Sequence, residues 1–288
     1  VLEALPNLRL ILATGMRNAR SIDLNATDEL GITVCTTDAL HQTTVEVTWM
    51  LILALFRGFP AEYKLLRSGG WQYGLGSGLA GKTLGILGLG NMGKPVAKIG
   101  QGFGMDVIAW SPNLTPERTQ PFDVKCVSKE DLFRQSDALT IHIPHTDTTE
   151  GLVDARSISL MKPQSFLINT SRPKLVDDDA LIDALVSGKI GGAGLDVFEH
   201  EPAVNPKLMS LDNVVLLPHM SSATYEGRQD MGEKVIINIQ SFADALLFQG
   251  KSSEQKPLPE EYALGNLVKL NQSYRKYDYG IIRPIWVV

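Results

Sequence analysis

Three side chains suited to acid–base chemistry each follow a run of residues typical of a buried strand. Arg172 follows "SFLINTS", Glu201 lies just past "GAGLDVF", and His219 follows "NVVLLP". Histidine exchanges protons near neutral pH, and a carboxylate beside it favours the protonated ring. Arginine binds a carboxylate through two parallel hydrogen bonds and stays charged. Together, these residue types suit proton transfer to a substrate that carries a carboxylate group.

A glycine-rich stretch, "GLGNMG", stands between a predicted strand and a predicted helix. It matches the G-x-G-x-x-G pattern, and the strand-to-helix context is the one that a dinucleotide site requires. Gly88 permits the tight turn, Gly90 lets the backbone approach a pyrophosphate, and Gly93 allows close packing of the helix. Asn91 and Met92 lie where the helix N-terminus offers N–H groups to phosphates. A plain strand-to-helix turn is the weaker alternative.

The predicted parallel sheet would bring these features together. The carboxyl ends of parallel strands share one edge, and the glycine loop opens on that edge. Hydride transfer to or from a nicotinamide must be matched by a proton moving on or off the substrate oxygen. We therefore predict that His219 is the acid/base, Glu201 its carboxylate partner and Arg172 the substrate anchor. Taken singly, each has a simpler explanation: a capping histidine, an acidic loop or a solvated arginine.

The residue at the end of the next strand bears on the choice of dinucleotide. An acidic residue there binds the ribose of NAD, whereas a nearby arginine accommodates the 2′-phosphate of NADP. The strand ends "AWSPN", which puts Ser111 where the acid would stand, and Arg118 is close by in the sequence. The cofactor is predicted to be NAD or NADP, with a slight preference for NADP.

The elements that must position these residues alternate along the chain. Continuous apolar strands separated by short helices predict a doubly wound parallel sheet of α/β class. Strands are expected at 83–90, 105–110, 123–127, 137–143, 165–170, 192–198 and 213–218, and helices at 94–104, 128–133, 155–161 and 178–188. Long helices near 43–58 and 221–248 would lead out of a second domain and back. The expected domains are 37–220 for the dinucleotide and 1–36 with 221–288 for the substrate.

The bulk composition excludes several classes of protein. The chain has 288 residues, 44% of them hydrophobic, and a net charge of −5 without a Lys/Arg-rich run, which argues against a nucleic-acid surface. Its longest apolar run, 49–56, is far shorter than the ~20 residues of a membrane helix. Cys35 and Cys126 stand in no metal spacing. We expect a cytoplasmic protein with no metal site and no membrane contact.

The ordered set "GLGNMG", "INTSRP", "GLDVFEHEP" and "LPHMSSAT" resembles the signatures of the D-isomer-specific 2-hydroxyacid dehydrogenases. The resemblance runs from about residue 8 to 244. It implies a Rossmann domain, a smaller flavodoxin-like substrate domain that is incomplete here, and the catalytic trio Arg172, Glu201 and His219. It further implies a homodimer with the helix near 43–58 at the interface.

The same resemblance assigns further contacts. Asp196 matches the aspartate that holds the nicotinamide carboxamide, and Thr170 lies among the cofactor-binding positions. Gly15 and Met16, in "TGMRN", match a loop that offers backbone N–H groups to the substrate carboxylate. Elsewhere, Trp71 and Tyr73 are interpreted as packing side chains, and His142 with His145 as a cofactor-side loop in preference to a metal pair.

The chain also departs from the family pattern. Pro173 stands where glycine usually follows the arginine, His145 where an apolar residue is common, and the stretch after about residue 250 does not match. Members carry a further segment before the equivalent of Val1. The expected function is reduction of a small 2-oxo acid, such as glyoxylate or hydroxypyruvate, to a D-2-hydroxy acid. The alternatives are formate dehydrogenase, disfavoured because those relatives carry glutamine at Glu201, a dinucleotide-sensing corepressor-like protein, and an inactive truncated paralogue.

Overall fold

The structure, a computed structural model, describes residues 1–14, 22–37 and 40–249. Within these ranges the chain divides into two compact units, one of residues 40–232 and the other of the described residues before 38 together with 233–249. The boundary at which the chain leaves the larger unit falls after residue 232, within the long helix α10 (Tyr225–Gln249). The sequence had placed this boundary after residue 220.

The larger unit contains a seven-stranded parallel sheet with the strand order β5-β4-β3-β6-β7-β8-β9. The order reverses between β3 and β6, and the crevice at such a switch point is where doubly wound folds bind ligands. The predicted doubly wound α/β fold is therefore confirmed. The strands are β3 (Thr83–Leu87), β4 (Asp106–Trp110), β5 (Lys125–Cys126), β6 (Ala138–Ile141), β7 (Phe166–Asn169), β8 (Gly192–Leu195) and β9 (Val214–Leu216).

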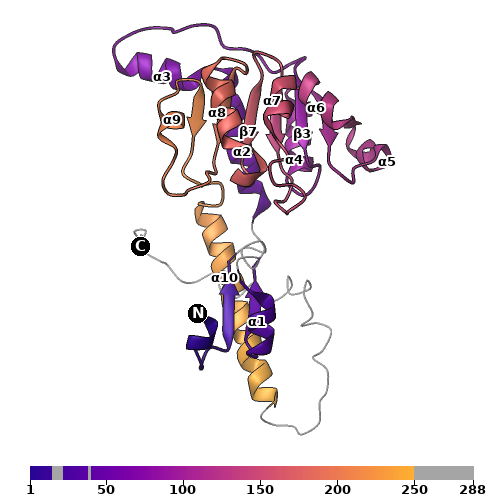
Figure 1. The fold of residues 1–288 in the computed structure, drawn as a ribbon, viewed down its shortest axis with the longest axis vertical. Helices are drawn as coiled ribbons and strands as arrows, with labels where there is room; N and C mark the ends of the chain where they lie inside the picture. Colours follow the sequence, from indigo (N-terminus) through magenta and orange to yellow (C-terminus); the bar gives the residue numbers. More distant parts are fainter. Residues whose placement is uncertain (15–21, 38–39, 250–288) are drawn as a thin grey trace. The chain divides into compact units, whose positions relative to one another are not determined.

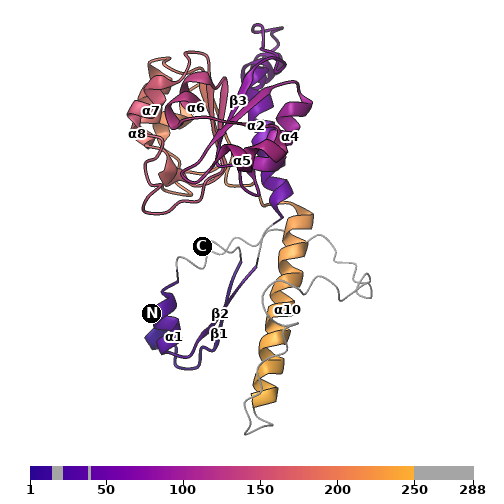
Figure 2. The same ribbon diagram turned by 90° about the vertical axis from the view of Figure 1, so that its right-hand side faces the viewer.

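Helices cover both faces of this sheet (Figures 1 and 2). Helices α2 and α4 lie on one face, and α6, α7 and α8 on the other. The helices are α2 (His41–Phe56), α3 (Phe59–Arg67), α4 (Gly93–Gly102), α5 (Pro116–Thr119), α6 (Lys129–Gln135), α7 (Ala155–Leu160), α8 (Asp178–Val186) and α9 (Pro206–Met209), with short 3-10 helices η3 (Gln120–Phe122) and η4 (Pro173–Leu175). The predicted cap of α6 forms, because the Ser128 hydroxyl accepts a hydrogen bond from the backbone N–H of Asp131.

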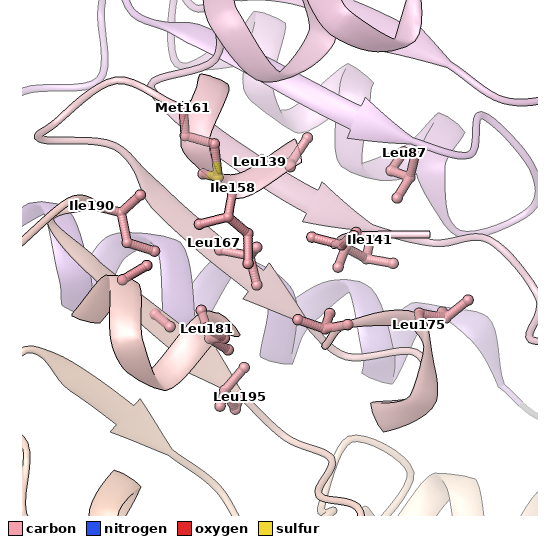
Figure 3. Packing of buried hydrophobic residues seen from close by; sticks show 14 of the residues in the cluster. Leu87, Leu139, Ile141, Ile158, Met161, Leu167, Leu175, Leu181, Ile190 and Leu195 are labelled. Atoms are coloured by element: carbon pink, nitrogen blue, oxygen red, sulfur yellow. The ribbon is translucent and has the colours of Figure 1, made fainter. Parts of the chain in front are cut away.

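Two apolar cores sandwich the sheet, which explains why its strands are apolar throughout. The core on the α6–α8 face, part of which is drawn in Figure 3, holds fully buried Leu139, Leu167 and Met161. The core on the other face includes Leu51 and Ile52 of α2. Most of α2 is thus buried within this unit, and its place at a dimer interface stays a prediction.

Trp71 and Tyr73 differ from their interpretation as packing residues. They lie in the loop after α3 and are 77% and 75% exposed, respectively. The backbone there is well anchored, since the carboxylate of Glu62 accepts hydrogen bonds from the N–H groups of Tyr73 and Gly74. The two aromatic side chains are therefore exposed although the backbone that carries them is fixed.

The smaller unit contains a parallel pair, β1 (Leu10–Ala13) and β2 (Thr33–Thr36), joined through α1 (Leu24–Glu29), after a 3-10 helix η1 (Leu2–Ala4). The Asp23 carboxylate caps α1. Within the same unit, the Asn238 side chain of α10 donates a hydrogen bond to the Thr36 carbonyl at 3.3 Å. Gly15, Met16 and the stretch from 250 on lie outside the described residues.

Among the described residues, no single helix is both long and apolar enough to cross a membrane. The consecutive helices α2 and α3 reach that length and composition only when taken together, and they are bent by 68° at their junction.

Candidate active site

The glycine loop between β3 and α4 lies at the switch point of the sheet. Gly88 has a φ of +105°, and its backbone N–H donates to the carbonyl of Trp110 at 2.9 Å. A Cβ at Gly88 would lie 2.9 Å from the backbone of His142, and one at Gly93 would collide with the Gly88 carbonyl. At Gly90, by contrast, no atom lies within 4 Å of the Cβ position. The loop thus has no room for a side chain at Gly88 and Gly93, where it turns and packs, but it is open at Gly90, where a pyrophosphate would approach.

His219 and Glu201 meet at the carboxyl edge of the same sheet. The Nδ1 atom of His219 lies 2.7 Å from a carboxylate oxygen of Glu201. The other carboxylate oxygen of Glu201 accepts a hydrogen bond from the backbone N–H of Phe198 at 2.9 Å, which fixes the carboxylate. Both side chains remain partly exposed, 45% for His219 and 33% for Glu201. This arrangement leaves Nε2 as the ring nitrogen that can exchange a proton with a bound molecule.

Arg172 follows β7, in a loop held by side-chain hydrogen bonds. Asn169 donates to the carbonyl of Arg172 at 2.9 Å and accepts from the N–H of Ser171 at 3.0 Å. The guanidinium donates to the Ser171 carbonyl at 2.7 Å. Burial lowers the pKa of Arg172, and the carboxylate of Glu201 raises it. Because β7 and β8 are neighbours in the parallel sheet, Arg172 lies at the same edge of the sheet as Glu201.

Pro173, one of the departures from the family pattern, occupies the first position of η4. The first N–H of a helix has no partner within it, so the missing N–H of proline is tolerated there. Arg172 is the N-cap residue of this helix and has extended backbone angles, as favoured before proline.

Asp196 follows β8 and is completely buried. Its two carboxylate oxygens accept hydrogen bonds from the backbone N–H groups of Met220, at 2.8 Å, and Ser221, at 3.0 Å. These are the two residues that follow His219. The contact between Asp196 and the nicotinamide carboxamide stays a prediction.

Thr170 and Ser111 lie at the ends of β7 and β4. The Thr170 hydroxyl lies 2.9 Å from that of Thr48, which itself donates to a backbone carbonyl within α2. Ser111 begins a turn that leads to α5, and Arg118 of α5 reaches back to donate a hydrogen bond to the carbonyl of Asn113 in that turn at 2.7 Å. Their contacts with a cofactor stay predictions.

His142 is buried beside the glycine loop. Its Nε2 is 2.9 Å from the Thr140 hydroxyl, and burial lowers its pKa to about 3, which keeps the ring neutral. His145 lies 3.2 Å from the carboxylate of Glu150. Among the described residues, no group of His, Cys, Asp and Glu has a geometry that could hold a metal ion.

Two parts of this site were missed in the sequence. Thr48 is far from any motif, and only its place on an apolar helix marks it. Asn169 lies inside "INTSRP", but nothing local shows that its side chain closes the loop around Arg172.

A Rossmann sheet with a glycine loop at its switch point and a carboxylate–histidine pair at the same edge defines a dinucleotide-dependent oxidoreductase. Residues 49–221 match the family model described as the NAD binding domain of D-isomer specific 2-hydroxyacid dehydrogenases. The chain therefore belongs to the D-isomer-specific 2-hydroxyacid dehydrogenase family, as the resemblance implied, and it is an enzyme of that class.

Individual relatives agree with this assignment. The chain is 41% identical to a glyoxylate reductase of Thermococcus litoralis over 84% of this chain and 76% of that protein. It is 38% identical to a hydroxypyruvate reductase of Thermotoga maritima over 83% and 79%. Among solved structures, a D-lactate dehydrogenase from Aquifex aeolicus in complex with NAD and lactic acid matches with a TM-score of 0.75 and 30% identity, over 86% of this chain and 80% of that one.

Proposed function

We propose that this enzyme reduces a small 2-oxo acid, of the glyoxylate and hydroxypyruvate type, to a D-2-hydroxy acid with NADH or NADPH. The observation that carries the proposal is the His219–Glu201 pair, 2.7 Å apart, at the edge of the sheet where the glycine loop opens and where Arg172 follows β7. The substrate class comes from the relatives named glyoxylate reductase and hydroxypyruvate reductase.

The glycine loop fits a dinucleotide, because the space around the Cβ position of Gly90 is open and the N-terminus of α4 follows the loop directly. When bound there, the reduced nicotinamide supplies a hydride for the substrate carbonyl carbon. Arg172 binds the substrate carboxylate and orients the carbonyl group. The Nε2 atom of His219 donates the proton that the carbonyl oxygen requires, and Glu201 stabilises the protonated ring before transfer.

The test is oxidation of NADH and NADPH with a panel of 2-oxo acids, by the parent enzyme and by His219→Gln. Removal of a general acid typically costs about 10²- to 10⁴-fold in rate, and dinucleotide affinity should not change. Equal turnover by parent and variant would refute the role of His219. A parent enzyme that binds dinucleotide but reduces none of the acids would favour the dinucleotide-sensing alternative. A parent enzyme that neither binds dinucleotide nor reduces any acid would favour the inactive paralogue.

We further propose a preference for NADP over NAD. No carboxylate stands at Ser111 to bind the ribose and repel a 2′-phosphate, and Arg118, on the short helix that follows, is hydrogen-bonded to the Asn113 carbonyl two residues after the serine. Ser111→Asp should shift the ratio of kcat/KM for NADH and NADPH towards NADH. Ser159→Asp, an exposed serine on α7, is the matched control and should leave the ratio unchanged. A parent strongly selective for NADH would contradict this preference.

We also propose that the enzyme is a homodimer. Helix α3 and the loop after it expose Phe59, Tyr63, Leu66, Trp71 and Tyr73. Aromatic residues are enriched in protein interfaces, and exposed apolar patches mark contact surfaces. The Glu62 carboxylate holds this loop in place, so an interface here would require little ordering. This surface is a better candidate than α2, most of which is buried within its own unit.

A further inference from the structure

Asn169, the last residue of β7, is buried and uses its side chain on the loop that follows the strand. Its amide oxygen accepts a hydrogen bond from the N–H of Ser171 at 3.0 Å, and its amide nitrogen donates to the carbonyl of Arg172 at 2.9 Å. An asparagine that bonds the backbone two residues on forms an Asx-turn, which bends the chain as a backbone turn does. The side chain thus fixes the peptide group before Ser171 and the one after Arg172.

The peptide group between these two carries the contact that orients the arginine. The carbonyl of Ser171 accepts a hydrogen bond from the Arg172 guanidinium at 2.7 Å. Peptide groups are planar and are joined by only two soft dihedral angles per residue, so the direction of this carbonyl depends on the peptide groups on either side. The buried Ser171 hydroxyl adds a further tie, because it donates to the carbonyl of Ile143 at 2.9 Å.

Downstream of Arg172 the backbone is already restrained. Pro173 begins η4, and the carbonyl of Arg172 also accepts a hydrogen bond from the N–H of Leu175 at 3.4 Å. A proline ring fixes its own φ and favours extended angles in the residue before it, as found at Arg172. The conformational freedom that is left to the loop therefore lies upstream of Arg172, in the segment that Asn169 spans.

We propose that Asn169 is a positioning residue, which sets the direction of the Arg172 guanidinium and thereby the binding of the substrate carboxylate. This inference rests on the proposed role of Arg172 as the substrate anchor. A guanidinium binds a carboxylate through two parallel hydrogen bonds only when the two planar groups are aligned. Without the amide of Asn169, the Ser171 carbonyl turns and the guanidinium loses its alignment, whereas dinucleotide affinity stays the same.

The experiment is a double-mutant cycle on the full chain, with glyoxylate as the probe. Asn169→Ala should lower kcat/KM about 100-fold, the scale of a 1 Å misplacement, with the dissociation constant for NADH unchanged. Asn169→Ser should lower it less, because a serine hydroxyl can form the same turn more weakly. In the Arg172→Lys background, Asn169→Ala should cost less than about threefold, because no planar group is left to align.

The matched control is an asparagine at the opposite edge of the sheet. Asn213 directly precedes β9, and its side chain donates to the carbonyl of Leu185 at 3.3 Å. Asn213→Ser also removes a hydrogen bond from an asparagine to a backbone carbonyl, but it lies far from the loop that carries Arg172. It should leave kcat/KM for glyoxylate unchanged.

A second readout requires no turnover. The guanidinium N–H signal of Arg172 in NMR spectra, assigned by its loss in Arg172→Lys, should shift in Asn169→Ala and stay in place in Asn213→Ser. If Asn169→Ala does not fold, Asn169→Ser is compared with the parent in the same way.

The outcomes separate this inference from the proposed function. A parent that reduces no 2-oxo acid would count against the proposed function, whereas an unchanged Arg172 signal in a folded Asn169 variant would overturn the positioning role. Equal losses of kcat/KM from Asn169→Ala in the Arg172 and Lys backgrounds would overturn it too, and would make Asn169 a structural residue of the loop.

Discussion

At the residue scale, Arg172 is held by features that a lysine could not reproduce. The guanidinium donates one N–H to the Ser171 carbonyl and carries four more N–H groups in a planar arrangement that an ammonium group lacks. Its charge survives burial because arginine stays protonated even where burial lowers its pKa.

Arg172→Lys should therefore lower kcat/KM for the 2-oxo acid strongly and leave dinucleotide affinity nearly unchanged. The ammonium group keeps the charge but loses the two-pronged geometry. Steady-state kinetics and titration with NADH measure the two effects. Arg156→Lys, at an exposed position of α7, is the matched control and should behave like the parent. Loss of dinucleotide binding with turnover spared would make Arg172 a phosphate ligand.

His142 gives a prediction about stability and pH. Burial lowers its pKa to about 3 in the folded chain, against the ordinary histidine value of 6.5 that applies once the chain unfolds. At pH values between about 3 and 6.5, His142 is protonated in the unfolded chain but neutral in the folded chain. The free energy of unfolding therefore falls as the pH drops through this range. From neutral pH to about pH 5, this single group should cost roughly 2 kcal/mol.

His142→Gln should remove that part of the pH dependence. Urea unfolding of parent and variant, each at about pH 7.5 and pH 5, gives the comparison, and the difference between the two pH values cancels any constant effect of the substitution. The parent should lose more stability than the variant on acidification. Equal losses would show that His142 does not stay neutral in the folded chain.

At the scale of elements, the contact between β3 and the start of α4 depends on Gly93. A Cβ there would collide with the Gly88 carbonyl and lie 3.0 Å from the Ile86 side chain. The glycine loop cannot keep its shape if α4 is pushed away. At the other end of the same helix, a Cβ on Gly102 would meet nothing within 4 Å.

Gly93→Ala should weaken dinucleotide binding by about tenfold or more, because the third glycine of the motif sets the packing of helix against strand. Gly102→Ala, the matched control, should leave binding unchanged and stabilise α4 by up to about 1 kcal/mol. Calorimetric titration with NADH measures the first effect, and thermal unfolding the second. Tight binding by Gly93→Ala would show that the loop tolerates a shifted helix.

At the scale of the whole molecule, the proposed homodimer gives a further test. Leu66 on α3 and Val186 on α8 are both exposed apolar residues of the same unit. Leu66→Glu should shift sedimentation from dimer to monomer, because a charge in the core of an apolar interface is costly to bury. Val186→Glu, outside the proposed surface, should not. A parent that sediments as a monomer would contradict the proposal.

Much of the fold could be predicted because the strands are buried on both faces. Each of the seven strands of the large sheet lies within or across its predicted segment, since a strand covered by helices reads as a continuous apolar run. Helices α1, α3, α5 and α9 were not predicted: α1, α5 and α9 are short, and α3 has large apolar residues that it does not bury. A local sequence pattern predicts a helix from the apolar face that the helix buries. Helix α3 buries no residue within this unit, so its pattern did not stand out.

The amino-acid sequence alone was enough to predict the succession of strands, the glycine loop and the residues at the sheet edge, because these depend on local pattern and on the shared direction of parallel strands. The contacts that orient those residues were decided by the tertiary structure. Asp196 reaches Met220 and Ser221, and Thr48 reaches Thr170. Such hydrogen bonds join residues far apart in the chain, and their geometry depends on strand register and packing that no local pattern records.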